Sequence, residues 1–444
     1  MIFTLTSDNP RFSFVISKNP ATILESGKPF SRELRKGKVY GWFPQARVDD
    51  GEIVGSQVFR LWFKDHPSES SFAGGVLENF EYLDKTRYSS PYLPIMMIQA
   101  ALSTAQKSRQ DLDGEYFTTA EWTMFAPDFR SLDSFVKHYA GQATVIVQNL
   151  SDKYVKVSLT AGSVFETLNM VIAMCVMQAM RDESVYIRLD ESGLTKYLNA
   201  LNNADSPYYP RYLFASRAIN NRGTFEKLRS QIQGPGMTMF FGDTRQQRFD
   251  AISAEIKKLP TENSTLIDLG CGELWYSVKL AKSYGQIIAI DSDEDLASSG
   301  QRKVEHKKLE NVTVVHADAL NLPETDDLIS SHEGCDVLIT EVLEHIPEER
   351  ADLLLRTLLT SSARRVIATV PNRNFNDNYG LGDDFRHPDH FYEPTFEEWS
   401  DYCYTLAAEF GVTADVRPIG DVVNDQSVTT MCVFTLPDLN DRAD

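Results

Sequence analysis

Two carboxylates and an imidazole stand close together at Glu341, Glu344 and His345. On a helix, the spacing i, i+3 and i+4 places all three side chains on one face. They follow an apolar run, 336–340, that predicts a strand, so we expect them near the start of the next helix. This donor set suits Mg²⁺, Mn²⁺ or Fe²⁺ better than soft-ligand metals, and zinc is also compatible. Acids at an ordinary helix start are the competing interpretation of the stretch alone.

A second group of histidines follows at His387 and His390. Together with His345 they are three of only eight histidines, and both groups are predicted to follow neighbouring strands. Ligands collect at the carboxyl ends of parallel strands. We therefore expect His390 to complete a metal site with Glu341, Glu344 and His345. His387 could contact a substrate phosphate, act as a base or simply lie on the surface.

A glycine-rich turn, 268–273, follows a predicted strand and opens a helix. Gly270 and Gly272 would let the backbone approach a ligand closely, but the third glycine of the dinucleotide fingerprint is missing, which disfavours NAD or FAD. Asp268, Asp291 and Asp318 end or follow three successive predicted strands. Taken alone, each aspartate is best interpreted as a turn residue or a helix cap. Together they favour nucleoside binding, with Asp291 on the ribose and Asp318 on an exocyclic amine.

The elements that position these residues alternate between strand and helix from about Gly242, which predicts a doubly wound, Rossmann-like parallel sheet. A helix at 395–408 and two adjacent closing strands suggest that the sheet ends in an antiparallel hairpin. The predicted strands are 265–268, 287–291, 312–315, 337–340, 365–370, 414–417 and 430–434.

The first half of the chain predicts an α+β domain. A strand is expected at 58–63, a hairpin at 143–147 and 154–159, and helices at 92–107 and 164–180. The Gly-Pro-Gly stretch 234–236 is the best linker candidate. We therefore expect an amino-terminal domain at 1–235 and a carboxyl-terminal domain at 236–444.

The bulk properties limit the class of protein. A net charge of −19 argues against broad, non-specific nucleic-acid binding but leaves room for a local site that holds a short end. Five scattered cysteines without a CxxC pair favour a reducing cytosol over a disulfide framework. The first residues predict no signal peptide, and the most apolar segment, 169–177, is too short to cross a membrane. We expect a cytoplasmic protein that does not contact membranes.

The turn at 268–272 resembles the first motif of class I S-adenosylmethionine-dependent methyltransferases, and this resemblance covers roughly 242–436. More narrowly, 341–345, 385–395 and 426–434 are similar to the HEN-type RNA 3′-terminal ribose 2′-O-methyltransferases. The bacterial branch of that family carries an amino-terminal domain, which 1–6, 39–44 and 82–101 resemble. At 240–248 the family's Pro-Pro-Leu core is replaced, although Phe240, Gln247 and Arg248 match.

This resemblance implies an enzyme of RNA repair that works on an RNA 3′ end. It implies S-adenosylmethionine at the turn, Mn²⁺ or Mg²⁺ on the four expected ligands, and substrate contacts by Arg248 and Arg386. It also implies that the amino-terminal domain binds and stimulates a polynucleotide kinase–phosphatase–ligase partner.

The chemistry such a site offers is activation of a poor nucleophile. A divalent ion would lower the pKa of a ribose 2′-hydroxyl and orient it toward the methyl donor. Four protein ligands leave two octahedral positions, which the 2′- and 3′-oxygens of a terminal nucleotide could fill. The alternatives are a methyltransferase for a small molecule or protein, a catalytically silent scaffold for a repair partner, and a dehydrogenase, which the missing glycine disfavours most.

Overall fold

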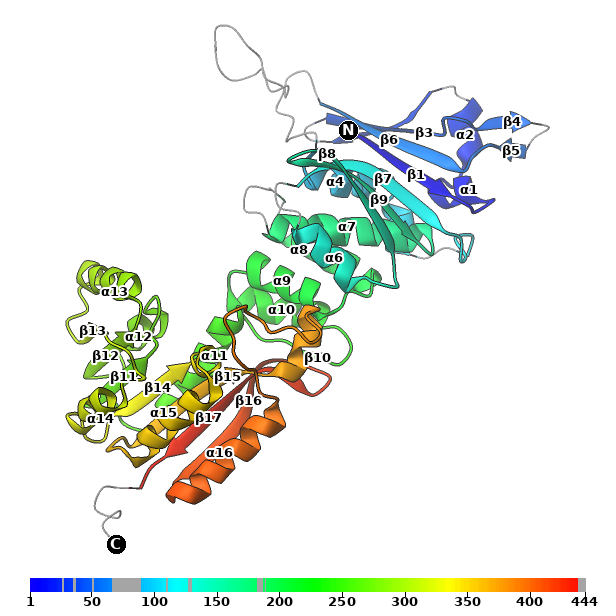
Figure 1. Cartoon of the computed structure of the whole chain (residues 1–444). Coiled ribbons are helices and arrows are strands. Elements are labelled where there is room, and N and C mark those ends of the chain that lie inside the picture. Colours follow the sequence, from blue (N-terminus) through cyan, green and yellow to red (C-terminus); the bar gives the residue numbers. More distant parts are fainter. Residues whose placement is uncertain are drawn as a thin grey trace, which may run out of the picture. The chain divides into compact units, whose positions relative to one another are not determined.

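The computed structural model describes residues 1–25, 28–34, 37–49, 52–65, 89–108, 111–126, 130–181, 187 and 189–437. The chain divides into two compact units, Met1–Pro235 and Gly236–Asp444, which are coloured from blue to green and from green to red in Figure 1. Of the stretch 82–101 that resembles the family's amino-terminal domain, residues 82–88 lie outside the described residues.

The amino-terminal unit is built on a seven-stranded antiparallel sheet in the order β2-β3-β6-β1-β7-β9-β8. Its strands alternate buried apolar and outward polar residues, as expected for a sheet with one face on the core. The predicted hairpin forms from β8 and β9. The strands are β1 (Ile2–Ser7), β2 (Phe30–Leu34), β3 (Gly37–Trp42), β6 (Val58–Asp65), β7 (Thr118–Phe125), β8 (Thr144–Ser151) and β9 (Tyr154–Ala161), and β4 (Arg47–Asp49) and β5 (Glu52–Val54) form a small separate hairpin.

Helices cover the buried face of this sheet, with α7 (Val164–Arg181) against it (Figure 1). Among the described residues, α7 alone is long and apolar enough to span a membrane, and 83% of that window is buried inside the protein. The helix predicted at 92–107 is interrupted at Leu102, which leaves the helical region. The other helices are α1 (Phe12–Ile16), α2 (Pro20–Glu25), α4 (Tyr92–Ala101), α5 (Ser103–Lys107), α6 (Arg130–His138), α8 (Glu191–Asn203), α9 (Tyr208–Ala218) and α10 (Arg222–Ile232).

The carboxyl-terminal unit has an eight-stranded mixed sheet in the order β10-β16-β17-β15-β14-β11-β12-β13. Strands β11 to β15 are parallel, and β17, β16 and β10 continue the sheet antiparallel, so the expected closing hairpin forms. The strands are β10 (Met237–Thr238), β11 (Thr265–Leu269), β12 (Gln286–Asp291), β13 (Val312–His316), β14 (Asp336–Thr340), β15 (Arg365–Pro371), β16 (Thr413–Val423) and β17 (Gln426–Thr435).

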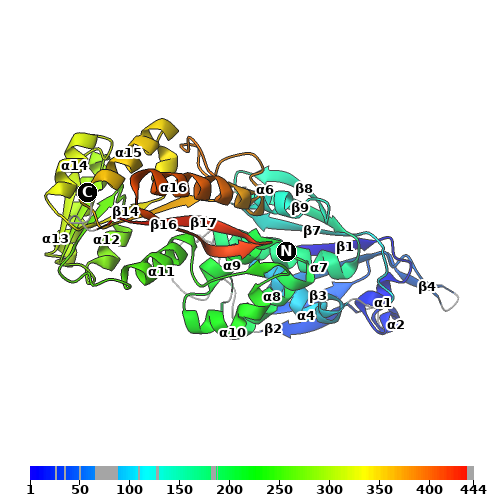
Figure 2. The same cartoon turned by 90° about the horizontal axis from the view of Figure 1, so that it is seen from below.

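Helices lie on both faces of this sheet, as Figure 2 shows. One apolar core joins the sheet to α14, α15 and α16, and two others join it to α11, α12 and α13. The doubly wound fold expected from the sequence is therefore confirmed. The helices are α11 (Thr244–Ile256), α12 (Trp275–Leu280), α13 (Glu294–Lys307), α14 (Leu322–Ser330), α15 (Glu348–Thr360) and α16 (Phe396–Phe410), with short 3₁₀ helices η2 (Leu343–His345) and η3 (Arg373–Tyr379).

A buried ion pair holds the amino ends of β14 and β15 together. Asp336 accepts hydrogen bonds from the guanidinium groups of Arg364 and Arg365 and from the hydroxyl of Tyr284. Although burial opposes ionisation, these hydrogen bonds and the Arg365 charge keep the pKa of Asp336 below its usual value. The opposite, carboxyl ends of the same strands carry the chemistry-bearing residues.

Candidate functional site

The glycine-rich turn lies where β11 ends. Gly270 and Gly272 have positive φ angles of 70° and 51°, a conformation that glycine adopts without strain. The amides of Gly270 and Cys271 both donate to the Ile290 carbonyl, which fixes the turn to β12. A Cβ atom on Gly270 would lie 2.5 Å from a methyl group of Val342, so the turn packs directly on the loop after β14.

The three expected cofactor acids occupy different environments near this turn. Asp268 is buried and accepts from the Ser277 hydroxyl, while its Oδ1 atom has no partner within the described residues. Burial raises the pKa of Asp268 to about 7. Asp291 ends β12 and accepts from the Gly272 amide at 2.7 Å. Asp318 is exposed, two residues beyond the end of β13, and accepts from the Leu320 amide at 2.9 Å.

The stretch 341–345 differs from the predicted helix start. Glu341 has a φ angle of 54°, in the left-handed region, and only Leu343–His345 form a short 3₁₀ helix. Pro347 disfavours a helical conformation at the preceding Ile346, which is extended, so α15 begins only at Glu348. The expectation that the three side chains share one helix face was therefore wrong, and their arrangement depends on a loop.

Three of the four expected metal ligands come together in this loop region. The ligand atoms of Glu344, His345 and His390 all lie within 4.8 Å of one another. The rings of His345 and His390 are 4.5 Å apart at an angle of 88°. These residues run from buried Glu344 through half-buried His390 to exposed His345.

Glu344 is the most informative member of this cluster. Its side chain is fully buried, and neither carboxylate oxygen accepts a hydrogen bond within the described residues. Burial, and then the charge of Glu341, raises the pKa of Glu344 well above its usual value. A buried carboxylate without a partner is costly, and a cation removes that cost. The residues present therefore fit a divalent ion with oxygen and imidazole ligands.

His390 is oriented by a residue to which the sequence assigned no role. Its Nδ1 atom lies 2.5 Å from Oε1 of Glu393, which leaves the other ring nitrogen for the cluster. Glu393 is buried and also accepts hydrogen bonds from the side-chain amide of Asn376 and the backbone amide of Arg386. Carboxylates commonly orient metal-binding histidines in this way. The signal was present in the sequence, because Glu393 stands three residues after His390.

Glu341 is engaged elsewhere in this structure. Its carboxylate pairs with the Arg248 guanidinium at 2.8 Å and accepts from the Thr369 hydroxyl at 3.1 Å. Arg248 also donates to the hydroxyl of Tyr276 at 3.2 Å. Glu341, which was expected to bind the metal, is thus held by Arg248, which was expected to contact substrate.

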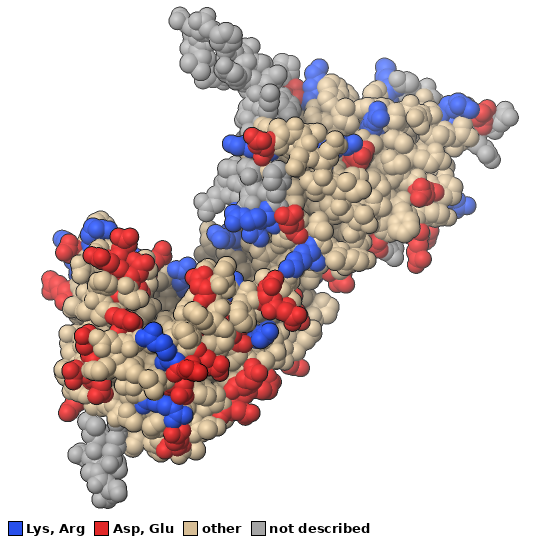
Figure 3. Space-filling model, viewed as in Figure 1, with Lys and Arg blue, Asp and Glu red and all other residues tan. Residues whose placement is uncertain are grey.

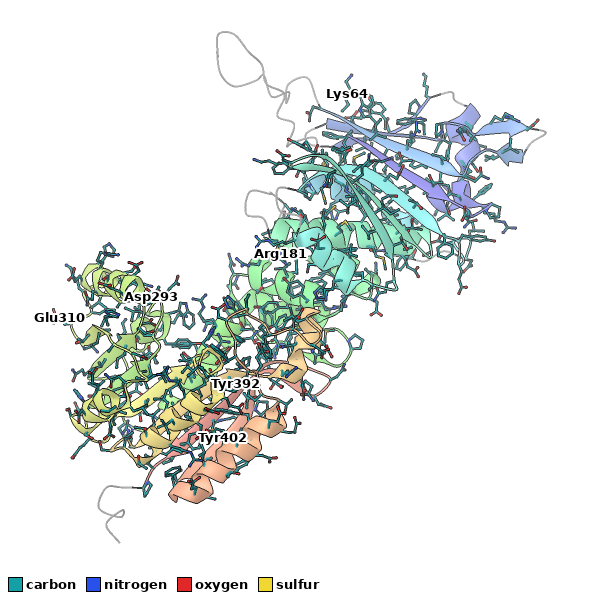
Figure 4. All side chains as sticks on the ribbon, in the orientation of Figure 1. Lys64, Arg181, Asp293, Glu310, Tyr392 and Tyr402 are labelled. Carbon is teal, nitrogen blue, oxygen red and sulfur yellow. The ribbon has the colours of Figure 1, made fainter. Side chains whose placement is uncertain are left out.

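His387 lies beside the cluster, on the solvent side. It is exposed, its ring centroid is 6.0 Å from that of His345, and its Nδ1 atom is 2.7 Å from Oδ1 of Asp389. His345, His387 and Asp389 form a second, fully exposed group of closely spaced ligand atoms. Tyr392, labelled in Figure 4, belongs to the same loop and packs against the core next to α15.

Arg386, for which the sequence predicted a substrate contact, makes several hydrogen bonds within the unit. Its guanidinium donates to the carbonyls of Asn372 and Val428 and to the side chain of Asn376, at 2.6 to 2.8 Å. It also lies over the rings of Phe375 and Tyr379. Through these contacts Arg386 holds the loop that carries His387 and His390, and the substrate contact stays a prediction.

Comparisons with known proteins were made for both units. The family described as "Hen1 N-terminal domain" matches residues 2–235, more than half of the chain, and a "Methyltransferase domain" family matches 266–361. The Small RNA 2'-O-methyltransferase of Caenorhabditis elegans is 29% identical over 163 residues, or 33% of this chain and 37% of that protein. The corresponding protein of Xenopus tropicalis is 25% identical over 209 residues, or 43% and 54%. The chain spans about half or less of these curated relatives.

Two solved structures share the fold over nearly the whole chain. They are titled "Structure of the Pnkp1/Rnl/Hen1 RNA repair complex" and "Structure of Pnkp1/Rnl/Hen1 complex". The TM-scores are 0.75 and 0.73 at 21% and 22% identity, and each match covers 98% of this chain and 100% of the other. The resemblance noted in the sequence is confirmed: with a Hen1 amino-terminal domain followed by a methyltransferase domain, the chain belongs to the Hen1 family.

Proposed function

We propose that this protein transfers a methyl group from S-adenosylmethionine to the 2′-hydroxyl of the 3′-terminal ribose of RNA, in RNA repair or end protection. The observation that carries the proposal is the buried, unpartnered carboxylate of Glu344 beside His345 and His390, next to the glycine-rich turn. Family membership and the names of the curated relatives support RNA as the substrate.

The cofactor is assigned to the turn and its three acids. Gly272 leaves open space at the carboxyl end of β11, and the Oδ1 atom of Asp268, which has no partner within the described residues, is available to the ligand. Asp291, which is held by the Gly272 amide, would accept from ribose hydroxyls, and exposed Asp318 would accept from the adenine amine.

The metal, Mn²⁺ or Mg²⁺, is assigned to Glu344, His345, His390 and Glu341. When bound, such an ion supplies a positive charge that lowers the pKa of a coordinated hydroxyl. Glu393 fixes the tautomer of His390 by holding its Nδ1 atom, so the other ring nitrogen points to the cluster as an acceptor. Glu341 would join the set if its ion pair with Arg248 were exchanged for the metal, and Arg248 would then be available to an RNA phosphate.

The exposed pair of His387 and Asp389 supplies the remaining chemistry on the solvent side. Asp389 holds one ring nitrogen of His387, and the other is free to take the proton that leaves the 2′-hydroxyl. Arg386 positions this histidine by fixing the loop from within.

The assignments for partner and compartment follow from the family. The amino-terminal unit is assigned to binding and stimulating a polynucleotide kinase–phosphatase–ligase protein, and the enzyme is assigned to the cytoplasm. The titles of the solved complexes, which name an RNA repair assembly, support a repair partner.

The test is methyl transfer from labelled S-adenosylmethionine to three matched RNAs that end in a free diol, a 2′-deoxy nucleotide or a 3′-phosphate. We expect transfer only to the diol, and its loss in chelator. Glu341→Ala and His390→Ala proteins should bind the cofactor, measured by calorimetry, and transfer nothing, whereas the exposed control Glu349→Gln should keep full activity. Equal labelling of the 2′-deoxy RNA, or full activity of either alanine variant in chelator, would contradict the proposal.

A further inference from the structure

One end of the amino-terminal sheet carries three aromatic rings on one face, of which Trp62 is exposed and Tyr40 and Trp42 are half-buried. Tyr40 on β3 pairs directly with Trp62 on β6, and their rings lie 5.5 Å apart at 28°. Trp42 follows on the same face of β3. Trp62 is 40% exposed. Large aromatic rings that remain in water on a sheet face indicate a surface that binds something.

Cationic side chains alternate with these rings along both strands. On β6, Arg60 and Lys64 flank Trp62 on the outward face, and on β3 Lys38 precedes Tyr40. The register places Lys38 opposite Lys64, and like charges directly opposite one another destabilise a sheet. Lys38 is paired with Glu33 at 2.6 Å, while Arg60 and Lys64 form no ion pair with the described residues.

This cationic group stands out because the chain as a whole carries a charge of −19. Figure 3 shows Lys and Arg side chains along one edge of the amino-terminal unit, with acidic ones elsewhere on it, and many acidic side chains among basic ones on the carboxyl-terminal unit. Lys64, labelled in Figure 4, lies at the end of β6.

A hollow of about 590 Å³ opens on this face. Ile23 and Leu24 of α2 form one wall, Tyr40, Trp42 and Trp62 contribute to its lining, and Lys64 is among the residues around it. The volume falls within the usual range of small-ligand sites and is sufficient for a nucleotide base.

We propose that this face of β3 and β6 binds single-stranded RNA as a second contact, separate from the 3′-end site. Bases stack on Trp62 and Tyr40, and phosphates lie against Lys64 and Arg60. Residues i and i+2 of a strand are separated by roughly 7 Å, so successive cations can follow an extended nucleotide backbone. An acidic peptide would satisfy the cations but leave the flat rings without planar partners. The choice of RNA as ligand rests on the proposed function.

Direct binding tests the face separately from methyl transfer. The probe is a 5′-fluorescein octauridylate with a 3′-phosphate, which removes the diol assigned to the metal site, and anisotropy is measured with the full chain over a range of salt. We expect Trp62→Leu to weaken binding about tenfold. Lys64→Gln should reduce the slope of log K against log salt by about 0.7. Phe117→Leu, at an aromatic residue 66% exposed elsewhere, and Lys137→Gln on α6 should bind as wild type.

The possible results distinguish failure of this proposal from failure of the proposed function. The proposal is overturned if Trp62→Leu and Lys64→Gln bind RNA with the affinity and salt slope of wild type while their circular dichroism is unchanged. Loss of a protein partner from these variants with unchanged RNA affinity would instead identify a protein-docking surface. If RNA binding depends on Trp62 while the wild type methylates no RNA, the second contact stands and the proposed function fails. If the wild type methylates RNA but RNA binding does not depend on Trp62, the proposed function stands and the second contact is ruled out.

Discussion

Glu344 and Asp268 are buried carboxyl groups that keep oxygen atoms without hydrogen-bond partners in the described residues. Such atoms lower the stability of a fold, so they are usually retained for a ligand. The sequence identified Asp268 because it ends a predicted strand, and Glu344 because of its spacing to Glu341 and His345. It could not identify the pairing of Arg248 with Glu341, because these residues are 93 positions apart and meet only in the folded unit.

Replacing Glu344 with glutamine should separate stability from metal binding. Glutamine keeps the shape but removes the buried charge, so in chelator the variant should unfold at the same temperature as wild type or a higher one. Mn²⁺ at a hundred times its dissociation constant should stabilise the wild type by about 2.7 kcal/mol and the variant hardly at all. Thermal unfolding with and without Mn²⁺ measures this. Glu349→Gln, an exposed acid on α15, is the control, and a full Mn²⁺ shift in Glu344→Gln would contradict the assignment.

Asp268 should make stability depend on pH in the absence of cofactor. Its pKa is about 7 in the folded protein and near 3.8 when unfolded, so the folded state binds its proton more tightly. Stability should therefore fall as pH rises from about 4 through 7, by roughly 2 to 3 kcal/mol between pH 5 and 8. In Asp268→Asn the free energy of unfolding should not show this decrease with pH, as measured by urea unfolding across the pH range. The exposed Asp401→Asn should retain it, and identical profiles for wild type and Asp268→Asn would show that burial does not shift this carboxyl.

At the scale of elements, the parallel strands were the most predictable part. All five were expected within one residue of their observed bounds, because strands buried on both faces form continuous apolar runs. The closing strands β16 and β17 are longer than predicted. The loop at 341–345 was predicted as helix because its spacing suits one, and Pro347 together with the left-handed Glu341 prevented it.

The contact between the glycine-rich turn and the loop after β14 predicts different effects for two glycines. Both have positive φ, so alanine should cost about 1–2 kcal/mol at either position. A Cβ on Gly270 also meets Val342, whereas one on Gly272 meets nothing within 4 Å. Gly270→Ala should therefore be less stable than Gly272→Ala by about 1–3 kcal/mol in urea unfolding. Adding Val342→Ala should recover part of that difference, and equal stabilities would rule out the contact.

At the scale of the whole molecule, the two units have separate cores and separate proposed ligands. The Gly-Pro-Gly linker made this division predictable, whereas the role of the amino-terminal unit depends on resemblance. The net charge of the chain argued against broad nucleic-acid binding. Because it is a sum over all residues, it gave no sign of the local cationic group of Arg60 and Lys64.

Calorimetry of the full chain should resolve two unfolding transitions, one for each unit. S-adenosylmethionine and Mn²⁺ should raise only the transition of the unit 236–444, because a ligand stabilises the unit that binds it. The same protein scanned with and without these ligands provides the comparison. A single transition that shifts as a whole would show that the units unfold together.

The graded burial of Glu344, His390 and His345 also has a kinetic consequence. Because the outermost ligand already faces solvent, an ion can enter and leave without any opening of the protein. The exchange rate is then set by how quickly the ion sheds its own water. Magnesium gives up water reluctantly, so manganese should load faster even where the two bind with equal strength. In a cell, the identity of an ion bound at this proposed site would therefore follow the supply of rapidly exchanging ions.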